Sequence, residues 1–167
     1  MLYTHSGGGS GGYLENVLFY AAKEIFNYNL TEIKYEVLKN QDFKETSLVI
    51  DGETKLKFAI AYGFRNIQNI VQKLKKGSCS YQFIEIMACP SGCLNGGGQI
   101  RDEKSILSKQ LFSKVNDMYN SVPIKLPDDN TFLKKVYENE NVEILKEQFH
   151  TTYHEIEKLT TSMIIKW

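Results

Sequence analysis

The chain has 167 residues, of which 42% are apolar and 24% are charged, and these proportions are ordinary for a globular protein with a hydrophobic core. Lysine and arginine total 20, as do aspartate and glutamate, so the formal net charge is zero. Binding to nucleic acid rests largely on excess positive charge, so this balance argues against a nucleic-acid partner. No apolar run approaches the roughly 18 residues that a membrane-spanning helix needs, so we expect no membrane partner.

The first residues and the cysteines indicate the compartment. Residues 1–12 lack both the basic start and the apolar stretch of a secretory signal peptide. The three cysteines, Cys79, Cys89 and Cys93, are odd in number and too few for a disulfide scaffold. We therefore expect a cytoplasmic location, with the nucleus as the alternative.

A glycine cluster at 7–12 opens directly into a predicted helix over about 13–27, where apolar residues recur at steps of three and four. A flexible linker is the alternative interpretation of these glycines, and the helix that follows directly weakens it. Gly7, Gly9 and Gly12 fit the pattern G-x-G-x-x-G, which holds a pyrophosphate in dinucleotide-binding folds. That motif needs a preceding strand, and only MLYTHS precedes it, so nucleotide binding is disfavoured.

The next part of the chain predicts strands joined by a helix. Alternating or continuous apolar residues indicate the strands, and the pair Asp51-Gly52 indicates a turn between two of them. The helix ends in a lysine-rich turn followed by Gly77, which suits a helix C-terminus. The order strand, helix, strand over 56–87 predicts a βαβ unit with a parallel strand pair. The predicted strands cover 33–37, 47–50, 56–62 and 81–87, and the helix covers 64–76.

The remainder of the chain is helical in pattern. Helices are predicted at roughly 103–120, 129–138 and 141–158, and an apolar tail ends on Trp167. The fold class is therefore α/β, with an α/β part over residues 1–100 followed by a helical C-terminal extension over residues 101–167.

The segment EIMACPSGCLNGGGQ, Glu85 to Gln99, carries the clearest chemistry. It begins at the carboxyl end of the last predicted strand, where open α/β sheets place their ligands. Cys89 and Cys93 are separated by three residues, so their thiolates suit one soft metal centre or a reversible disulfide. The glycines at 96–98 would allow an inorganic cluster to approach the backbone. Spacing alone leaves open a second interpretation, in which the glycines serve a sharp turn and the cysteines are small buried residues.

The string MACPSGCLNGGGQ resembles the third cluster-binding motif of iron-only hydrogenases. It is more similar to the hydrogenase-like eukaryotic proteins of cytosolic iron–sulfur assembly, a group that includes the nuclear prelamin A recognition factor-like proteins. Three further strings resemble the same family: GGSGGYLENVLFYAAKEIF, AYGFRNIQNIVQKLKKG with YQFIEIMACP, and FHTTYHEIEK. The resemblance implies that residues 1–100 are part of the C-terminal domain of an iron-hydrogenase large subunit, with a βαβ unit and a parallel sheet. It implies a helical extension over 101–167 that is similar to the small subunit of these enzymes.

The resemblance also implies a cofactor. In the family both cysteines of this motif ligate a 4Fe–4S cluster, so Cys89 and Cys93 are the expected ligands. Such a cluster normally takes four thiolates. The family's other two come from motifs upstream of the glycine turn, which this chain does not contain, so it resembles the C-terminal third of a longer protein. Cys79 matches no family ligand, and we expect it to be structural.

The function implied by the resemblance is non-catalytic: a protein of cytosolic iron–sulfur assembly that transfers 4Fe–4S clusters to apoproteins. Hydrogenases commonly continue GGGQ with proline, whereas Ile100 follows Gln99 here. The alternatives are a fragment of a true iron-only hydrogenase, a module that binds the prelamin A tail, and a thiol–disulfide oxidoreductase that uses the two cysteines.

Three other features have simpler interpretations beside their functional ones. His150 and His154 are spaced as metal ligands on a helix, but packing is the favoured role. Glu85 is expected to hydrogen-bond a neighbouring loop. Trp167 is either an aromatic anchor that docks on proteins of the cytosolic iron–sulfur targeting complex, as the resemblance implies, or a packed side chain.

Overall fold

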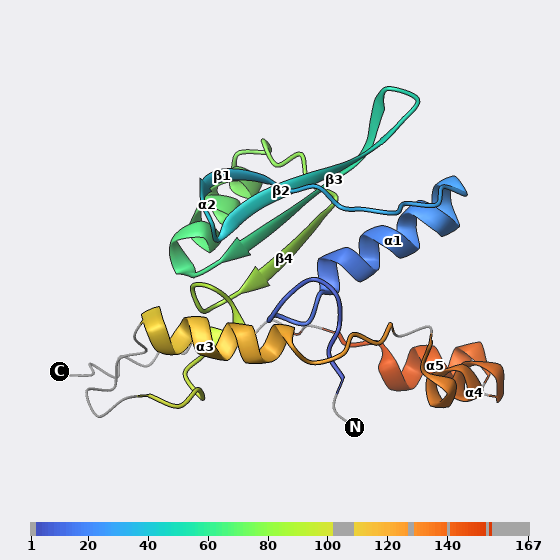
Figure 1. Cartoon of the computed structure of the whole chain (residues 1–167). Coiled ribbons are helices and arrows are strands. Elements are labelled where there is room, and N and C mark those ends of the chain that lie inside the picture. The colour runs from blue at the N-terminus through green and yellow to red at the C-terminus, as the bar shows by residue number, and fades with distance from the viewer. Residues whose placement is uncertain (1–2, 102–108, 127–128, 140, 153, 155–167) are drawn as a thin grey trace, which may run out of the picture. The chain divides into compact units, whose positions relative to one another are not determined.

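The structure is a computed structural model that describes residues 3–101, 109–126, 129–139, 141–152 and 154 (Figure 1). The chain forms two compact units, Met1–Pro127 and Asp128–Trp167. No helix within the described ranges combines the length and the apolar character needed to cross a membrane. The first unit holds α1 (Tyr13–Phe26), β1 (Glu36–Asn40), β2 (Phe43–Ile50), β3 (Glu53–Tyr62), α2 (Phe64–Lys75), β4 (Phe83–Met87), the short 3₁₀ helix η1 (Cys93–Asn95) and α3 (Lys109–Asn120).

One four-stranded sheet, ordered β1-β2-β3-β4, organises the first unit. The first two strand pairs are antiparallel, whereas β3 and β4 are parallel, with Phe58 opposite Phe83 and Tyr62 opposite Met87. Helix α2 makes the crossover between the two parallel strands (Figure 1). The predicted α/β class and βαβ unit are therefore confirmed.

The turn between β2 and β3 is the two-residue Asp51-Gly52 loop that the sequence predicts. Asp51 has a φ of 53° and Gly52 a φ of 79°. Two successive positive φ angles suit the right-handed twist of a hairpin, and aspartate followed by glycine adopts them at low cost. This turn sets the long β2–β3 pairing, which runs from Phe43 opposite Ala61 to Ile50 opposite Glu53.

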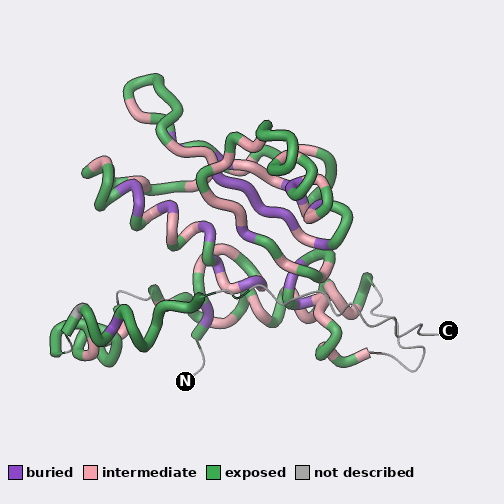
Figure 2. Tube along the Cα trace, turned by 180° about the vertical axis from the view of Figure 1, so that it is seen from behind, coloured by how far each residue is buried: buried purple, intermediate pink, exposed green. Residues whose placement is uncertain are grey.

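The core lies on both faces of the sheet because β3 contributes to each face in alternation. Phe58 and Ile60 pack with Leu14, Leu18 and Ala22 of α1 on one face. On the other face Ala59 and Ala61 pack with Ile70 of α2 and Phe43. Helices α1 and α2 thus cover opposite faces, and the buried residues follow β3 and the inner side of α1 (Figure 2). Burial on both faces explains why this strand is almost continuously apolar.

The strand predicted at 33–37 starts too early. Pairing begins only at Glu36, and β1 runs to Asn40. Ile33 and Tyr35 do pack against the core, so the alternation of apolar and polar residues predicted correctly which side chains face it. A strand also needs a hydrogen-bonded neighbour, and β2 reaches β1 only at Glu36, Val37 and Asn40. Strand β2 conversely begins at Phe43, four residues before the predicted start at Ser47.

The second unit contains α4 (Thr131–Asn139) and α5 (Val142–Phe149). Asn130 and Asn141 precede these helices, and their side-chain oxygens accept hydrogen bonds from the backbone N–H groups of Phe132 and Glu143. Helix α5 ends at Phe149 and His150 is extended, so the expected helix over 141–158 is too long. His150 and His154 consequently do not share a helix face. The domain division at residue 100 stays a prediction.

Candidate metal centre

The two motif cysteines lie in the loop that follows β4. The backbone N–H of Gly63, at the end of β3, donates to the carbonyl of Met87, the last residue of β4, at 2.8 Å. This bond brings the carboxyl ends of the two parallel strands together where the cysteine loop starts. Cys89 is half-buried, Cys93 is exposed, and neither forms a disulfide. The loop therefore occupies the edge of the sheet that the sequence predicts for a ligand.

Backbone hydrogen bonds shape this loop as successive tight turns. Gly92 N–H donates to the Cys89 carbonyl at 3.1 Å, and Gly96 N–H donates to the Cys93 carbonyl at 3.0 Å. The side chain of Gln99 also donates to the Cys93 carbonyl, at 3.2 Å. Ser91 and Gly92 both have positive φ angles, 61° and 77°. Hydrogen bonds within the loop's own backbone thus fix the positions of Cys89 and Cys93 relative to each other.

The two glycine clusters of the sequence pack against each other. A Cβ atom on Gly92 would lie 2.0 Å from the Ser10 Oγ, and one on Gly9 would lie 2.3 Å from the Leu94 Cγ. Ser10 is buried between the clusters, and its Oγ accepts a hydrogen bond from the backbone N–H of Cys93 at 3.4 Å. Gly9 and Gly92 therefore each lie where the backbone comes too close to a neighbouring side chain for a Cβ atom to fit. The sequence did not indicate that each cluster approaches the other.

Gly97 and Gly98 are different. A Cβ atom on either residue would have no heavy atom within 4 Å, and neither residue has a positive φ. The described part of the chain therefore does not require glycine at these positions. Close approach by an inorganic cluster stays a prediction for them.

The sulfur atoms near the loop come from Cys89, Cys93 and Met87. Cys93 Sγ lies 4.0 Å from the thioether sulfur of Met87. Cys79 precedes β4, so the five residues of that strand, at about 3.3 Å each, separate it from the loop. Within the described ranges, no group of three or more histidine, cysteine, aspartate and glutamate side chains is placed to hold a metal. A 4Fe–4S cluster normally takes four thiolates, so the two motif cysteines alone would not complete one, and their assignment as ligands stays a prediction.

A hydrogen-bonded network behind the loop is centred on Glu85 of β4. This carboxylate is 4% exposed and accepts a hydrogen bond from the backbone N–H of Leu14 at 2.7 Å. A carboxylate at the N-terminus of a helix also interacts favourably with the helix dipole. Glu85 was expected to hydrogen-bond a neighbouring loop, but the N–H group that it accepts from belongs to the first turn of α1.

The hydroxyl of Tyr62 connects this network to the glycine cluster. It hydrogen-bonds Glu85 and also Ser10, which receives the Cys93 N–H. Burial raises the pKa of the Tyr62 hydroxyl above its ordinary value, and the hydrogen bond to Glu85 raises it further. Tyr62 is therefore a neutral hydroxyl that can donate one hydrogen bond and accept another. It joins β3, β4, the glycine cluster and the cysteine loop.

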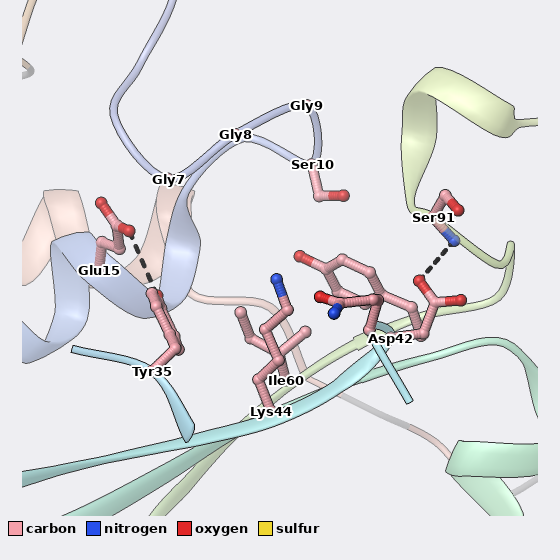
Figure 3. A pocket seen from close by; sticks show the side chains of 12 residues that line it. Gly7, Gly8, Gly9, Ser10, Glu15, Tyr35, Asp42, Lys44, Ile60 and Ser91 are labelled. Atoms are coloured by element: carbon pink, nitrogen blue, oxygen red, sulfur yellow. Dashed lines mark hydrogen bonds between the residues drawn. The ribbon is translucent and has the colours of Figure 1, made fainter. Parts of the chain in front are cut away.

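A cavity of about 280 Å³ lies beside the loop (Figure 3). At one side, Asp42 Oδ1 accepts a hydrogen bond from the Ser91 backbone N–H at 2.7 Å. At the other side, the Tyr35 hydroxyl donates to Glu15 at 3.2 Å (Figure 3). Contacts between residues this far apart leave no local pattern, so sequence reasoning missed Asp42 and Tyr35. The lining comprises Gly7, Gly8, Gly9, Ser10, Glu15, Tyr35, Gln41, Asp42, Lys44, Ile60, Tyr62 and Ser91.

Comparison with known proteins relates this arrangement to named groups. Residues 3–97 match the family described as "Iron only hydrogenase large subunit, C-terminal domain". Two of the solved structures that share the fold are FeFe-hydrogenases. One is an FeFe-hydrogenase studied for oxygen inactivation of its H cluster, at 24% identity and a TM-score of 0.67, with 92% of this chain and 45% of that chain covered. The other is an apo FeFe-hydrogenase from Chlamydomonas reinhardtii, at 22% identity and a TM-score of 0.61, with 83% and 41% covered.

Curated relatives are more similar in sequence. The "Cytosolic Fe-S cluster assembly factor narfl" of Xenopus tropicalis is 48% identical, over 98% of this chain and 35% of the relative. The protein of the same name from Danio rerio is 45% identical, over 99% and 41%. The "Cytosolic iron-sulfur assembly component 3" of Rattus norvegicus is 44% identical, over 98% and 35%. The chain thus spans 35% to 41% of the length of these relatives.

Proposed function

The chain belongs to the family defined by the C-terminal domain of the iron-only hydrogenase large subunit, and on this basis we propose that it supplies two thiolate ligands of a 4Fe–4S cluster in a protein of cytosolic iron–sulfur assembly. The protein transfers 4Fe–4S clusters to apoproteins and does not evolve hydrogen. Its location is the cytoplasm.

The observation that carries this proposal is the contrast in identity. Relatives named for cytosolic iron–sulfur assembly are 44% to 48% identical over almost the whole chain. The hydrogenases of known structure are 22% and 24% identical. The Cys89–Cys93 loop at the carboxyl end of β4 supports the cluster part of the proposal, because its two thiols lie where this fold class places ligands.

Each residue of the site has a separate role in this proposal. Cys89 and Cys93 hold the cluster as thiolates, and the tight turns set their spacing. The Oγ of Ser10 accepts a hydrogen bond from the backbone N–H of Cys93. Ser10 is itself positioned by a hydrogen bond with the Tyr62 hydroxyl. When bound, the cluster supplies the iron and sulfide that are passed on. Two further thiolates come from outside this chain, because four are needed and its remaining cysteine, Cys79, is not one of the proposed ligands.

Metal titration of the chain tests the ligand assignment. Cadmium added to the reduced chain should produce an ultraviolet thiolate-to-metal band, and C89S or C93S should each remove about half of it or more. C79S is the matched control and should leave the band unchanged. An equal loss with C79S would contradict the assignment.

Reconstitution with iron and sulfide tests the number of ligands. Because two thiolates are missing, the chain alone should retain far less iron than one full cluster per chain. Iron analysis after anaerobic gel filtration measures this. A complete cluster on the isolated chain would overturn the proposal that half of the site lies elsewhere.

A chimera separates the assembly function from the hydrogenase alternative. In it, residues 3–167 replace the matching third of the Xenopus relative. The reconstituted chimera should load an apoprotein that requires a 4Fe–4S cluster and should evolve no hydrogen with a reduced electron donor. Robust hydrogen evolution would favour the hydrogenase alternative instead.

The partners are the proteins of the cytosolic iron–sulfur targeting machinery, and Trp167 is the proposed anchor. This residue lies outside the described residues, so its role rests on the sequence. In the chimera, W167A should reduce co-purification of the targeting proteins, and W167F should retain most of it. A prelamin A tail peptide serves as the comparison bait; its selective capture would favour the prelamin-binding alternative.

A further inference from the structure

A second hollow lies away from the cysteine loop, between the end of β1 and the first turns of α2. Its volume is about 410 Å³, and its lining consists of Lys39, Asn40, Arg65, Asn66 and Asn69. Arg65 and Asn69 lie four residues apart on α2 and therefore share one side of that helix. We refer to these five residues as the Lys39–Arg65 hollow.

The charge of this hollow is entirely positive. Among the described residues, Lys39 and Arg65 are the only ionisable groups that line it, and no carboxylate does. Within the described part of the chain neither cation forms an ion pair, whereas Lys55, Lys57 and Lys146 each lie beside a glutamate. Two cations that converge without a counter-charge create a local positive field, although the whole chain has no net charge.

The floor of the hollow is held in place by a pair of amides. Asn40 Nδ2 donates to Asn66 Oδ1 at 3.2 Å, and Asn66 Nδ2 donates back to Asn40 Oδ1 at 3.1 Å. Asn66 is 4% exposed, and its Nδ2 also donates to the Tyr62 carbonyl at 2.8 Å. Both Asn66 donors are thereby used, while one Nδ2 hydrogen of Asn40 remains available. The positions of Asn40 and Asn66 are therefore set before a ligand arrives, which reduces the entropic cost of ordering these two side chains on binding.

We propose that the Lys39–Arg65 hollow binds the phosphate groups of a small polar molecule. The guanidinium of Arg65 matches two phosphate oxygens at once, and Lys39 adds a second positive charge. The volume lies within the usual range for small-molecule sites, so a molecule larger than inorganic phosphate would fit. No aromatic or aliphatic side chain of the described residues lines the hollow, which disfavours a nucleobase and favours a polar molecule. This site does not depend on the cysteines.

Pyrophosphate is the probe, and side-chain amide resonances are the reporters. In ¹⁵N-labelled chain, pyrophosphate should shift the Asn40, Asn66 and Asn69 side-chain amides at submillimolar concentration, and inorganic phosphate should bind more weakly. Citrate carries a similar charge on carboxylates and should bind at least about tenfold more weakly than pyrophosphate. If citrate binds as tightly, the phosphate assignment is wrong. If these amides do not shift, the site itself is wrong.

Substitutions in the Lys39–Arg65 hollow test whether pyrophosphate binds there. The double variant K39A/R65A should weaken pyrophosphate binding by about tenfold or more, because both charge-assisted contacts are lost. R65K should have a smaller effect because it keeps the charge without the planar fork. N69D should abolish binding by placing a carboxylate in the hollow, whereas N69A should have little effect.

The matched control is K75A, because Lys75 is an exposed lysine on the same helix that does not line the hollow. None of the substituted residues is buried, and far-ultraviolet circular dichroism verifies that each variant is folded. Equal weakening by K75A would show that binding is a general effect of surface charge, and would overturn the proposal.

Discussion

Gly92 is the residue with the least tolerance for a side chain in the cysteine loop. It has a φ of 77°, and a Cβ atom there would lie 2.0 Å from Ser10 Oγ. G92A should therefore lower the free energy of unfolding by about 1–3 kcal/mol, measured by urea denaturation. G97A is the matched control, since Gly97 has neither a positive φ nor a near neighbour among the described residues, and should change the free energy of unfolding by less than about 0.5 kcal/mol.

A double variant separates the two causes. S10A removes the Oγ that collides with the new Cβ, so G92A in an S10A background should cost less than G92A alone. The free-energy cost that G92A still has in the S10A background measures the strain of placing alanine at a positive φ. Equal costs in both backgrounds would show that the packing of the two glycine clusters contributes nothing.

Glu15 of α1 gives a pH dependence whose sign follows from burial. Desolvation raises the pKa of this carboxyl above its ordinary value of 4.5, the hydrogen bond from Tyr35 opposes the rise, and the charge of Glu85 adds to it. The unfolded chain therefore loses the Glu15 proton at lower pH than the native chain. As pH rises past 4.5, ionisation of this group destabilises the fold until its native pKa is passed.

The variant E15Q should remove this contribution, because glutamine stays neutral and keeps an oxygen for Tyr35. Its free energy of unfolding, relative to that of the unaltered chain, should rise as the pH is raised through and above 4.5 and should be constant at neutral pH. Urea denaturation across about pH 4–8 measures the difference. A difference that is independent of pH would contradict the burial argument.

At the scale of elements, α2 is held to the sheet by a narrow apolar contact. Ile70 is completely buried against Phe43, Ala59 and Ala61, and two of these neighbours are already small. I70A should therefore leave a cavity that the alanines cannot fill, and should cost about 2–4 kcal/mol of unfolding free energy. V71A, on the same helix but 40% exposed, should cost clearly less. Similar costs for both would place the helix contact elsewhere.

Elements were predictable where one local signal determines them. Asp51-Gly52 predicts its turn because both residues accept a positive φ, and the apolar run at 56–62 predicts a doubly covered strand. The start of β1 was not predictable, because it depends on pairing with β2 rather than on the alternation around Ile33.

The site shows the same division. The spacing of Cys89 and Cys93 can be recognised directly in the sequence, and so can the need for glycine at a tight turn. The hydrogen bonds of Asp42 to Ser91 and of Glu85 to Leu14 join residues 49 and 71 positions apart, so no periodicity records them. Predicting which residues surround a motif therefore requires the folded structure, whereas the motif itself can be recognised in the sequence.

At the scale of the whole chain, β4 is an edge strand within the described residues. It pairs with β3 on one side only, and Ile86 is 46% exposed. An edge with an exposed β-branched residue is a template for pairing with a second copy. Because the chain spans only 35% to 41% of its curated relatives, we expect the isolated chain to self-associate through this edge. Light scattering coupled to gel filtration should show a mass that rises with concentration.

A lysine on that edge should suppress the association, because a charged side chain on an edge strand opposes pairing with another strand. I86K is therefore expected to shift the chain toward the monomer mass of 19.2 kDa. I25K is the matched control: Ile25 is 68% exposed but lies on α1, so the same charge there should leave the association unchanged. If I25K suppresses association as well as I86K, a general gain in charge is responsible, and the edge of β4 is not the contact.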